Sequence, residues 1–379
     1  MKLLIFNEKG IKLKGMIARL IIGLLCIIII SLLVFIVAVA FTSKGEIENF
    51  TDDSGNVIKG SIAERTFIDV NGKRNGLIIR SRNEDNPVLL FISGGPGVPE
   101  YWLNDAYKKQ YLNKLEDEFT VCWWDYIGEG LSYDKSVNPE EITLEKLTED
   151  AVVVTDYLKE RFGVTKVYLM AHSGGTMLGM NLAKEHPELF YCYFAMGQVN
   201  NPGYDRHEAG YNYMKTYFEE IKDEKNLRKL ESLVDKSGEH ITLNNKYHDG
   251  HWEQMLLAAG CGTTRDMRSD VTGIFFPQMF SHCYTFKEKI NYWLGKSLLS
   301  KSPYSNESKR VYENMQIDIP VVFLSGKYDY TTPIEDARLL YEMIESEDKA
   351  FYEFSNSAHS PLWEENEEVL EVMKKYVDE

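Results

Sequence analysis

Short apolar runs alternate with segments of helical periodicity along most of the chain. The apolar runs, which are typical of buried strands, lie at residues 65–70, 76–81, 87–93, 119–126, 166–171, 191–197, 317–326 and 350–355. Segments with apolar residues at helical spacing lie at 147–163, 176–190 and 331–344, and an acidic helical segment ends the chain. Strands that alternate with helices in this way predict right-handed βαβ units, so we expect an α/β fold with a mostly parallel sheet.

The alternation stops in one long central region. Between residues 200 and 314 the pattern is helical or irregular, with aromatic residues scattered through it. An α/β core of residues 61–199 and 315–379, interrupted by a helical insertion at 200–314, accounts for the whole pattern. Residues 42–60, which are polar and contain glycine, are typical of a linker.

The N-terminal region contains a segment long enough to cross a membrane. Residues 20–41 carry no charge, and a helix of that length spans roughly 33 Å, against a hydrocarbon core of about 30 Å. The preceding tail, residues 1–19, holds five basic residues: Lys2, Lys9, Lys12, Lys14 and Arg19. The positive-inside rule therefore predicts a single-pass protein of the cell membrane, with a cytoplasmic N-terminus and everything after Phe41 outside the cell.

A cleaved signal peptide is the alternative for this segment, because Ala38-Val39-Ala40 resembles a cleavage site. The apolar run is longer than the core of a usual signal peptide, which favours an uncleaved anchor. A buried core helix is disfavoured, since nothing on the segment is polar enough to face water.

Composition narrows the range of partners. The net charge of −16 argues against nucleic acid as the main partner, because phosphate binding needs a basic surface. No Cys-x-x-Cys pair or histidine cluster at ligand spacing indicates a metal site. Cys261 and Cys283 could pair in an extracellular domain, but their spacing leaves this open.

Ser173 is the candidate nucleophile. It lies in "LMAHSGGT", directly after an apolar strand and directly before a helix, which is the context of the nucleophile elbow Gly-x-Ser-x-Gly. The sharp turn requires small neighbours; Gly175 satisfies one side, and Ala171 adds a single methyl group on the other. The pentapeptide alone is moderate evidence, because serines in glycine-rich turns are common.

Asp329 and His359 are the candidate partners of Ser173. A serine hydroxyl needs a base and the base needs an orienting acid, and in this type of sheet the order along the chain is Ser, Asp or Glu, then His. Asp329 follows one apolar strand in "FLSGKYDYTTP", and His359 follows the next in "FYEFSNSAHSP". Each alone reads equally well as a turn or loop residue, but all three at strand ends in this order indicate a catalytic triad.

The loop "FISGGPGVPE" supplies the fourth element. It follows the third predicted strand, and its backbone N–H groups can face a developing oxyanion. We assign the oxyanion hole to Gly95 together with Gly174, whose N–H lies at the start of a helix.

Taken together, these motifs resemble the α/β-hydrolase superfamily, and within it the proline iminopeptidase group of serine aminopeptidases. That group has a His-Gly-Gly-Pro-Gly loop, an Asp-x-x-Gly-x-Gly-x-Ser segment, the elbow, and a late Asp and His. This chain has "SGGPG", "DYIGEGLS" from Asp125 to Ser132, "AHSGG", Asp329 and His359. Ser93 replaces the loop histidine, and Ala171 replaces the first glycine of the elbow. The resemblance covers roughly residues 60–379 and gives Asp125 a structural role.

The resemblance implies that insertion 200–314 is a helical cap over the site. Cap carboxylates hold the free amine of the substrate in that group, and Glu208 is the candidate here, with an exposed helix carboxylate as the plainer interpretation. The implied enzyme needs no cofactor: Ser173 is acylated, His359 moves protons, Asp329 orients His359, and water releases the acyl group. A short peptide with a free N-terminus is the preferred substrate.

Two alternatives remain. An ester or a lipid is the second choice of substrate, whereas epoxide hydrolysis and dehalogenation are disfavoured because they use a carboxylate nucleophile. A ligand-binding relative with an inactive triad is the alternative from another class. The intact triad disfavours this non-catalytic interpretation, whereas Ser93 in place of the loop histidine leaves it open.

Overall fold

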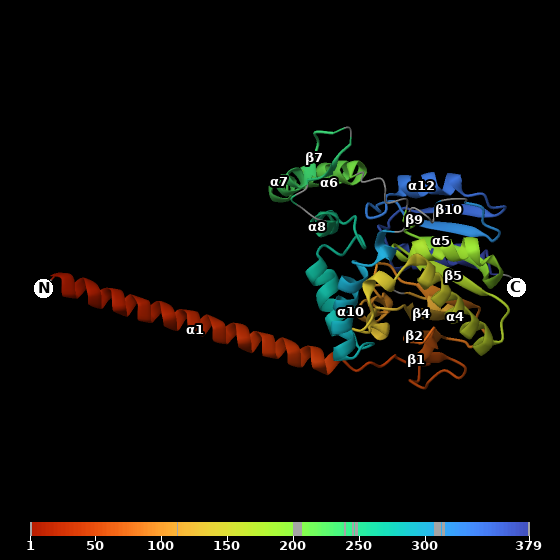
Figure 1. The fold of residues 1–379 in the computed structure, drawn as a ribbon, viewed down its shortest axis with the longest axis horizontal. Helices are drawn as coiled ribbons and strands as arrows, with labels where there is room; N and C mark the ends of the chain where they lie inside the picture. The colour runs from red at the N-terminus through yellow and green to blue at the C-terminus, as the bar shows by residue number, and fades with distance from the viewer. Residues whose placement is uncertain are drawn as a thin grey trace.

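One twisted sheet organises the protein. The structure is a computed structural model, and it describes residues 2–111, 113–199, 207–238, 240–244, 246, 249–306, 312 and 315–377. Within these residues the strands form an eight-stranded sheet in the order β1-β2-β4-β3-β5-β6-β9-β10 (Figure 1). The strands are β1 (Ile62–Val70), β2 (Lys73–Ser81), β3 (Val88–Ile92), β4 (Thr120–Asp125), β5 (Val167–His172), β6 (Phe190–Met196), β9 (Val321–Gly326) and β10 (Lys349–Phe354).

The sheet is mostly parallel, as the sequence predicts. β1 pairs with β2 and β2 with β4 in antiparallel fashion, and every other neighbouring pair is parallel. The turn between β1 and β2 is an Asn-Gly turn: Asn71 and Gly72 have φ values of 50° and 80°, the left-handed conformation that a two-residue hairpin requires.

Helices cover both faces of the sheet. The helices of the core are α2 (Tyr101–Ala106), α3 (Leu115–Glu118), α4 (Leu144–Phe162), α5 (Gly175–Glu185), α12 (Ile334–Met343), α13 (Pro361–Glu364) and α14 (Asn366–Lys374). Short 3₁₀ turns are η1 (Gly130–Ser132), η2 (Pro139–Glu141), η3 (Pro187–Leu189) and η5 (Pro303–Asn306).

Successive residues of each strand enter different apolar clusters. Leu90, for example, belongs to the cluster that includes residues of α4, α5 and α12, while Phe91 belongs to the cluster with residues of α2, α3, α13 and α14. Because β3, β4, β5 and β9 are buried on both faces, these strands appear in the sequence as nearly continuous apolar runs without polar alternation. This is why their positions are visible in the sequence.

The insertion consists of two parts. The first part holds α6 (Glu208–Glu220), α7 (Glu224–Leu233), the short strands β7 (Val234–Asp235) and β8 (Thr242–Leu243), and α8 (Asp249–Ala259). It has an apolar cluster of its own, to which Tyr330 of the core adds a partly buried ring. The pair β7–β8 was not predicted by the helical pattern.

The second part of the insertion packs on the core. It holds η4 (Val271–Phe275), α9 (Phe276–Phe280) and α10 (Phe286–Leu299). A Cβ on Gly295 of α10 would lie 2.3 Å from the backbone oxygen of Gly128, so the two backbones are in close contact. The predicted limits of the insertion, Asn200 and Asn314, lie outside the described residues.

The N-terminal helix α1 (Lys2–Thr42) projects away from the globular body (Figure 1). Its Met16–Thr42 portion is the one helix among the described residues that is long and apolar enough to cross a membrane. Its most apolar stretch of 18 residues has a mean hydropathy of 3.5 and is not buried inside the protein. A signal sequence passes the same test.

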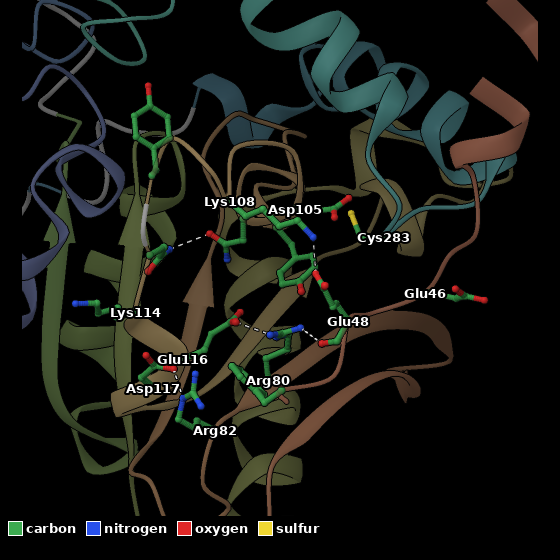
Figure 2. A pocket seen from close by; sticks show the side chains of 15 residues that line it. Glu46, Glu48, Arg80, Arg82, Asp105, Lys108, Lys114, Glu116, Asp117 and Cys283 are labelled. Atoms are coloured by element: carbon green, nitrogen blue, oxygen red, sulfur yellow. Dashed lines mark hydrogen bonds and ion pairs between the residues drawn. The ribbon is translucent and has the colours of Figure 1, made fainter. Parts of the chain in front are cut away.

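The residues that follow α1 do not form a free linker. Gly45 and Glu46 donate backbone hydrogen bonds to the carbonyl of His282, at 2.9 and 3.2 Å. Arg80 of β2 donates to the backbone carbonyl of Glu48, and Lys108 pairs with the Glu48 carboxylate at 2.6 Å (Figure 2). Residues 43–50 are therefore a strap held against the domain.

A polar cavity of about 410 Å³ lies beside this strap (Figure 2). Its basic side chains are already paired: Arg80 with Glu116 at 2.8 Å, Arg82 with Asp117 at 2.7 Å, and Lys114 with Glu367 at 2.7 Å. Burial raises the pKa of Glu116 and Arg80 opposes that effect. None of the candidate catalytic residues lines the cavity. The ion pairs of Arg80 and Arg82 hold α3 against the end of β2, and Arg80 also binds the Glu48 carbonyl of the strap.

Candidate active site

Ser173 occupies the sharp turn between β5 and α5. Its φ is 51°, one of the few positive values at a residue other than glycine among the described residues. Such a conformation costs about 1–3 kcal/mol and persists only where the surroundings enforce it. The backbone N–H of Ser173 donates to the carbonyl of Met196 at 3.0 Å, which ties the turn to the end of β6. The backbone is thus that of a nucleophile elbow.

The alanine at the first elbow position is accommodated by a glycine on the following helix. A Cβ on Gly179 of α5 would lie 2.7 Å from the Cβ of Ala171, closer than real side chains approach. The hydrogen at Gly179 therefore leaves the space that the methyl group of Ala171 fills. Gly175 meets the usual requirement on the other side, because a Cβ there would lie 2.3 Å from the carbonyl oxygen of Ser93.

Asp329 and His359 lie together at the carboxyl ends of β9 and β10. Oδ2 of Asp329 is 2.8 Å from Nδ1 of His359, and both side chains are buried. The other carboxylate oxygen accepts backbone hydrogen bonds from Thr331 and Thr332, at 3.0 and 2.9 Å. Thr332 Oγ1 also donates to Oδ2 at 2.8 Å. These contacts fix the carboxylate so that it orients the imidazole.

The other ring nitrogen of His359 is available. Nε2 is buried and has no hydrogen-bond partner among the described residues. The ring packs on Gly197 at the end of β6, where a Cβ would lie 2.8 Å from Cε1 of His359. Met196, which precedes Gly197, accepts the hydrogen bond from the Ser173 N–H. The serine and the histidine therefore both contact the end of β6.

The predicted oxyanion loop packs directly on the elbow. A Cβ on Gly174 would lie 2.1 Å from the carbonyl oxygen of Gly95, and one on Gly94 would lie 2.9 Å from the Cβ of Ser173. Gly95 has a φ of 126°, a conformation that side chains rarely adopt. Ser93, which stands where a histidine is expected, accepts a hydrogen bond from the Glu100 N–H at 3.2 Å and so closes the loop. The structure brings Gly95, Gly174 and Ser173 together.

This arrangement agrees with comparisons to known proteins. A family model described as alpha/beta hydrolase fold matches residues 87–366, a stretch that contains the loop, the elbow, Asp329 and His359. The chain is an α/β-hydrolase.

Among its relatives is the Bacillus subtilis protein named "Probable aminopeptidase YbaC", 31% identical over 310 residues, which are 81% of this chain and 94% of that protein. The "Proline iminopeptidase" of Saccharolobus solfataricus is 24% identical over 301 residues, 78% of this chain and 86% of that protein. These relatives confirm the resemblance to proline iminopeptidases. The solved structure of the N-acyl homoserine lactone degrading enzyme Est816 is similar in fold alone, with a TM-score of 0.51 at 15% identity over 82% of this chain and 100% of that one.

The α/β-hydrolase contains a second carboxylate–histidine pair behind the elbow, which the sequence analysis did not identify. His172 Nδ1 lies 2.6 Å from Oε1 of Glu100, and its Nε2 lies 2.9 Å from the backbone oxygen of His359. Burial disfavours the charged ring, but Glu100 outweighs that effect and the pKa of His172 is raised. Both residues lie within motifs of the sequence analysis: His172 precedes the serine, and Glu100 ends "GGPGVPE". The motifs therefore contained both residues but gave no sign that they contact each other.

Glu208 is not brought to the other site residues by any described contact. It begins α6, where its carboxylate lies 3.6 Å from Nδ1 of His240, and both side chains are about 40% exposed. Asp125 is buried and accepts hydrogen bonds from the Leu131 N–H at 2.8 Å and from Tyr284, in agreement with a structural role.

The cysteines of the hydrolase that the structure describes are all free. Cys261 and Cys283, the pair left open above, are both buried in different apolar clusters. Burial raises the pKa of both thiols.

Proposed function

We propose that this α/β-hydrolase is a serine hydrolase that works through an acyl-enzyme. The observation that carries the proposal is the strained backbone of Ser173, at φ 51°, beside the hydrogen-bonded pair Asp329–His359. Nε2 of His359 has no hydrogen-bond partner in the described part of the chain. A serine held in this way needs a base within reach, and His359 Nε2 is that base.

The proposed reaction has two balanced halves. Ser173 Oγ attacks the acyl carbon while its proton passes to Nε2 of His359, and the same proton then goes to the leaving amine as the C–N bond breaks. Water repeats the sequence on the ester, giving the acid and free serine. The backbone N–H groups of Gly95 and Gly174 stabilise the oxyanion. The loop that holds Gly95 packs directly on the turn that holds Gly174, so both groups lie at the same place.

We infer that the preferred substrates are short peptides with a free N-terminus. Support comes from the relatives, one named an aminopeptidase and one a proline iminopeptidase. The direct test compares kcat/KM for an aminoacyl-aminocoumarin, its N-acetylated counterpart and a p-nitrophenyl ester. We expect the free amine to be cleaved best. Equal cleavage of the acetylated compound would assign the enzyme to the esterases or endopeptidases instead.

Glu208 is proposed to receive the substrate amine. A charge-assisted hydrogen bond is worth roughly 1.5–3 kcal/mol, and about 1.4 kcal/mol corresponds to a factor of ten. For Glu208→Gln we therefore expect kcat/KM for free-amine peptides to fall about ten- to a hundredfold. Hydrolysis of the neutral ester should hardly change, because the ester has no amine to hold.

Glu224→Gln is the matched control for this variant. Glu224 opens the next cap helix, α7, as Glu208 opens α6, and it is exposed in an ion pair with Arg228. It should leave both substrates unaffected. Equal losses on peptide and ester in Glu208→Gln would indicate a structural role through His240, and no loss would leave Glu208 as a solvated cap residue.

We further propose that α1 anchors the enzyme in the cell membrane with the catalytic domain outside. Its apolar length and the basic residues before it support this orientation. Proteolysis of intact cells should remove a C-terminal tag, as judged by immunoblotting. A tag that stays protected would reverse the orientation, and a mature N-terminus near Phe41 would show that the segment is a cleaved signal peptide.

A further inference from the structure

A group of exposed apolar side chains lies where the cap meets α1. Residues 271–280 of η4 and α9 carry no charge, and Val271 and Phe276 are 49% and 40% exposed. On α10, Ile290 and Leu294 are 43% and 46% exposed and, being four residues apart, share one helix face. We refer to these four residues as the apolar rim.

The apolar rim is continuous with the side of α1. The ring of Phe35 lies 6.2 Å from that of Phe275, 5.9 Å from that of Phe276 and 5.8 Å from that of Phe280. Phe275 in turn packs against Trp293 of α10 at 5.5 Å. Packed aromatic rings therefore join α1 to α9 and, through Trp293, to α10.

The position of Phe35 along α1 sets the level of the rim. Phe35 precedes the last helical residue, Thr42, by seven positions, or about 10 Å of helix. If α1 crosses a bilayer up to that end, Phe35 and the rings around it lie below the level at which the helix leaves the hydrocarbon. The end itself is fixed to the cap, since Lys289 Nζ donates to Thr42 Oγ1 at 3.2 Å and Val39 is fully buried.

We propose that the apolar rim is inserted in the membrane leaflet on the catalytic side, so that the cap rests in the lipid beside α1. The proposal depends on the membrane anchoring proposed above. Apolar helical segments at an interface bury about 5–10 Å into the boundary between headgroups and acyl chains. Lys287, exposed one turn before Ile290, is placed to reach the headgroups, as lysines at such boundaries commonly do.

The test measures contact with lipid at single labelled positions in the full chain. Cys26→Ser removes the exposed cysteine of α1 and leaves the four buried ones. In that background Phe276→Cys and Leu294→Cys carry an environment-sensitive fluorophore, and the protein is reconstituted in phosphatidylcholine and phosphatidylglycerol vesicles that contain nitroxide-labelled lipid. Leu339→Cys is the matched control, because Leu339 of α12 is also an exposed leucine, at 60%, and no described contact joins it to α1.

We expect nitroxides near the headgroup end of the acyl chain to quench positions 276 and 294 strongly, and nitroxides at mid-chain to quench them less. Position 339 should be quenched by neither. Two rim positions are used so that a folding defect in one variant does not decide the result. Flotation of the same vesicles reports anchoring separately: protein that floats without quenching at 276 and 294 would overturn the rim proposal and leave the anchor intact. If the labels at 276 and 294 became shielded from solvent only as the protein concentration rises, a second copy of the chain would cover the apolar rim. That result would also overturn the rim proposal.

Discussion

Ser173→Ala is expected to lower kcat by about 10³-fold or more on peptides and esters alike, while the domain stays folded. The oxygen removed is the one that would form the acyl bond, so what remains is catalysis by the oxyanion groups and by binding. Steady-state assays of the purified variant, with circular dichroism to check the fold, measure the effect. A fluorophosphonate probe should label the wild type at Ser173 and leave the variant unlabelled.

Ser325→Ala is the control for this experiment. Ser325 lies at the end of β9, its side chain is buried, and its Oγ has no described hydrogen-bond partner. The change removes an equivalent oxygen from the same region and should keep near-normal activity. If Ser173→Ala retained more than a few per cent of wild-type activity, Ser173 would not be the nucleophile.

Glu100→Gln is expected to reduce kcat/KM by about tenfold just above the ordinary histidine pKa of about 6.5, where the wild type keeps a His172 charge that the variant has lost, and to reduce it less at acidic pH. Both ring nitrogens of His172 face acceptors, the Glu100 carboxylate and the carbonyl of His359, an arrangement that the imidazolium cation satisfies, and the raised pKa of His172 favours that cation. The cation holds the backbone of His359 in place. We therefore propose that Glu100 and His172 position the catalytic histidine.

The direction of the pH effect follows from the raised pKa of His172, to which Glu100 and, more weakly, Asp329 contribute. The stabilisation is fully present below the ordinary histidine pKa of about 6.5 and is lost as pH rises through the raised value. Glutamine keeps a hydrogen-bond acceptor but removes the charge, so the alkaline limb of the kcat/KM profile should move to lower pH. Urea unfolding should show the accompanying loss of stability in the same pH range.

Glu129→Gln is the control for this prediction. It tests whether the shift of the kcat/KM profile is specific to Glu100 or follows the replacement of any buried acid. Glu129 is also buried, and burial next to Asp125 raises the pKa of its carboxyl well above the usual range. Its replacement should leave the pH profile in place. If Glu100→Gln lowered activity by one factor at every pH, the pair would be merely structural.

The strands and long helices were predictable because their pattern is local. β3, β4 and β9 are buried on both faces and appear as apolar runs, and α4 begins at the Thr143 cap and ends at Gly163, at φ 66°. The packing of residues 43–50 was not predictable, because it depends on the distant carbonyl of His282 and on Arg80. The sequence pattern of a polar segment is typical of a linker even when the segment is packed on the domain, because the residues that bind its backbone lie far along the chain.

The same distinction applies to the site. Ser173, Asp329 and His359 follow strands, and the carboxyl ends of parallel strands meet at one edge, so order and context were enough to nominate them. The contact between Glu100 and His172 joins residues 72 positions apart, and no local pattern encodes it. Glu208 was nominated from resemblance alone, and its only described ion pair is with His240.

The contact between Ala171 and Gly179 has a consequence for how such enzymes are found in genomes. A Cβ on Gly179, about one turn into α5, would lie 2.7 Å both from the Cβ of Ala171 and from Cε2 of Tyr193, so the methyl group of Ala171 fits only while position 179 is glycine. A search pattern that insists on glycine at the first position discards chains of this kind, whereas one that requires a small residue there and glycine eight residues later retains them. We would expect Ala171→Gly to be tolerated, whereas Gly179→Ala should be destabilising with or without it, because the added Cβ would still lie 2.7 Å from Cε2 of Tyr193.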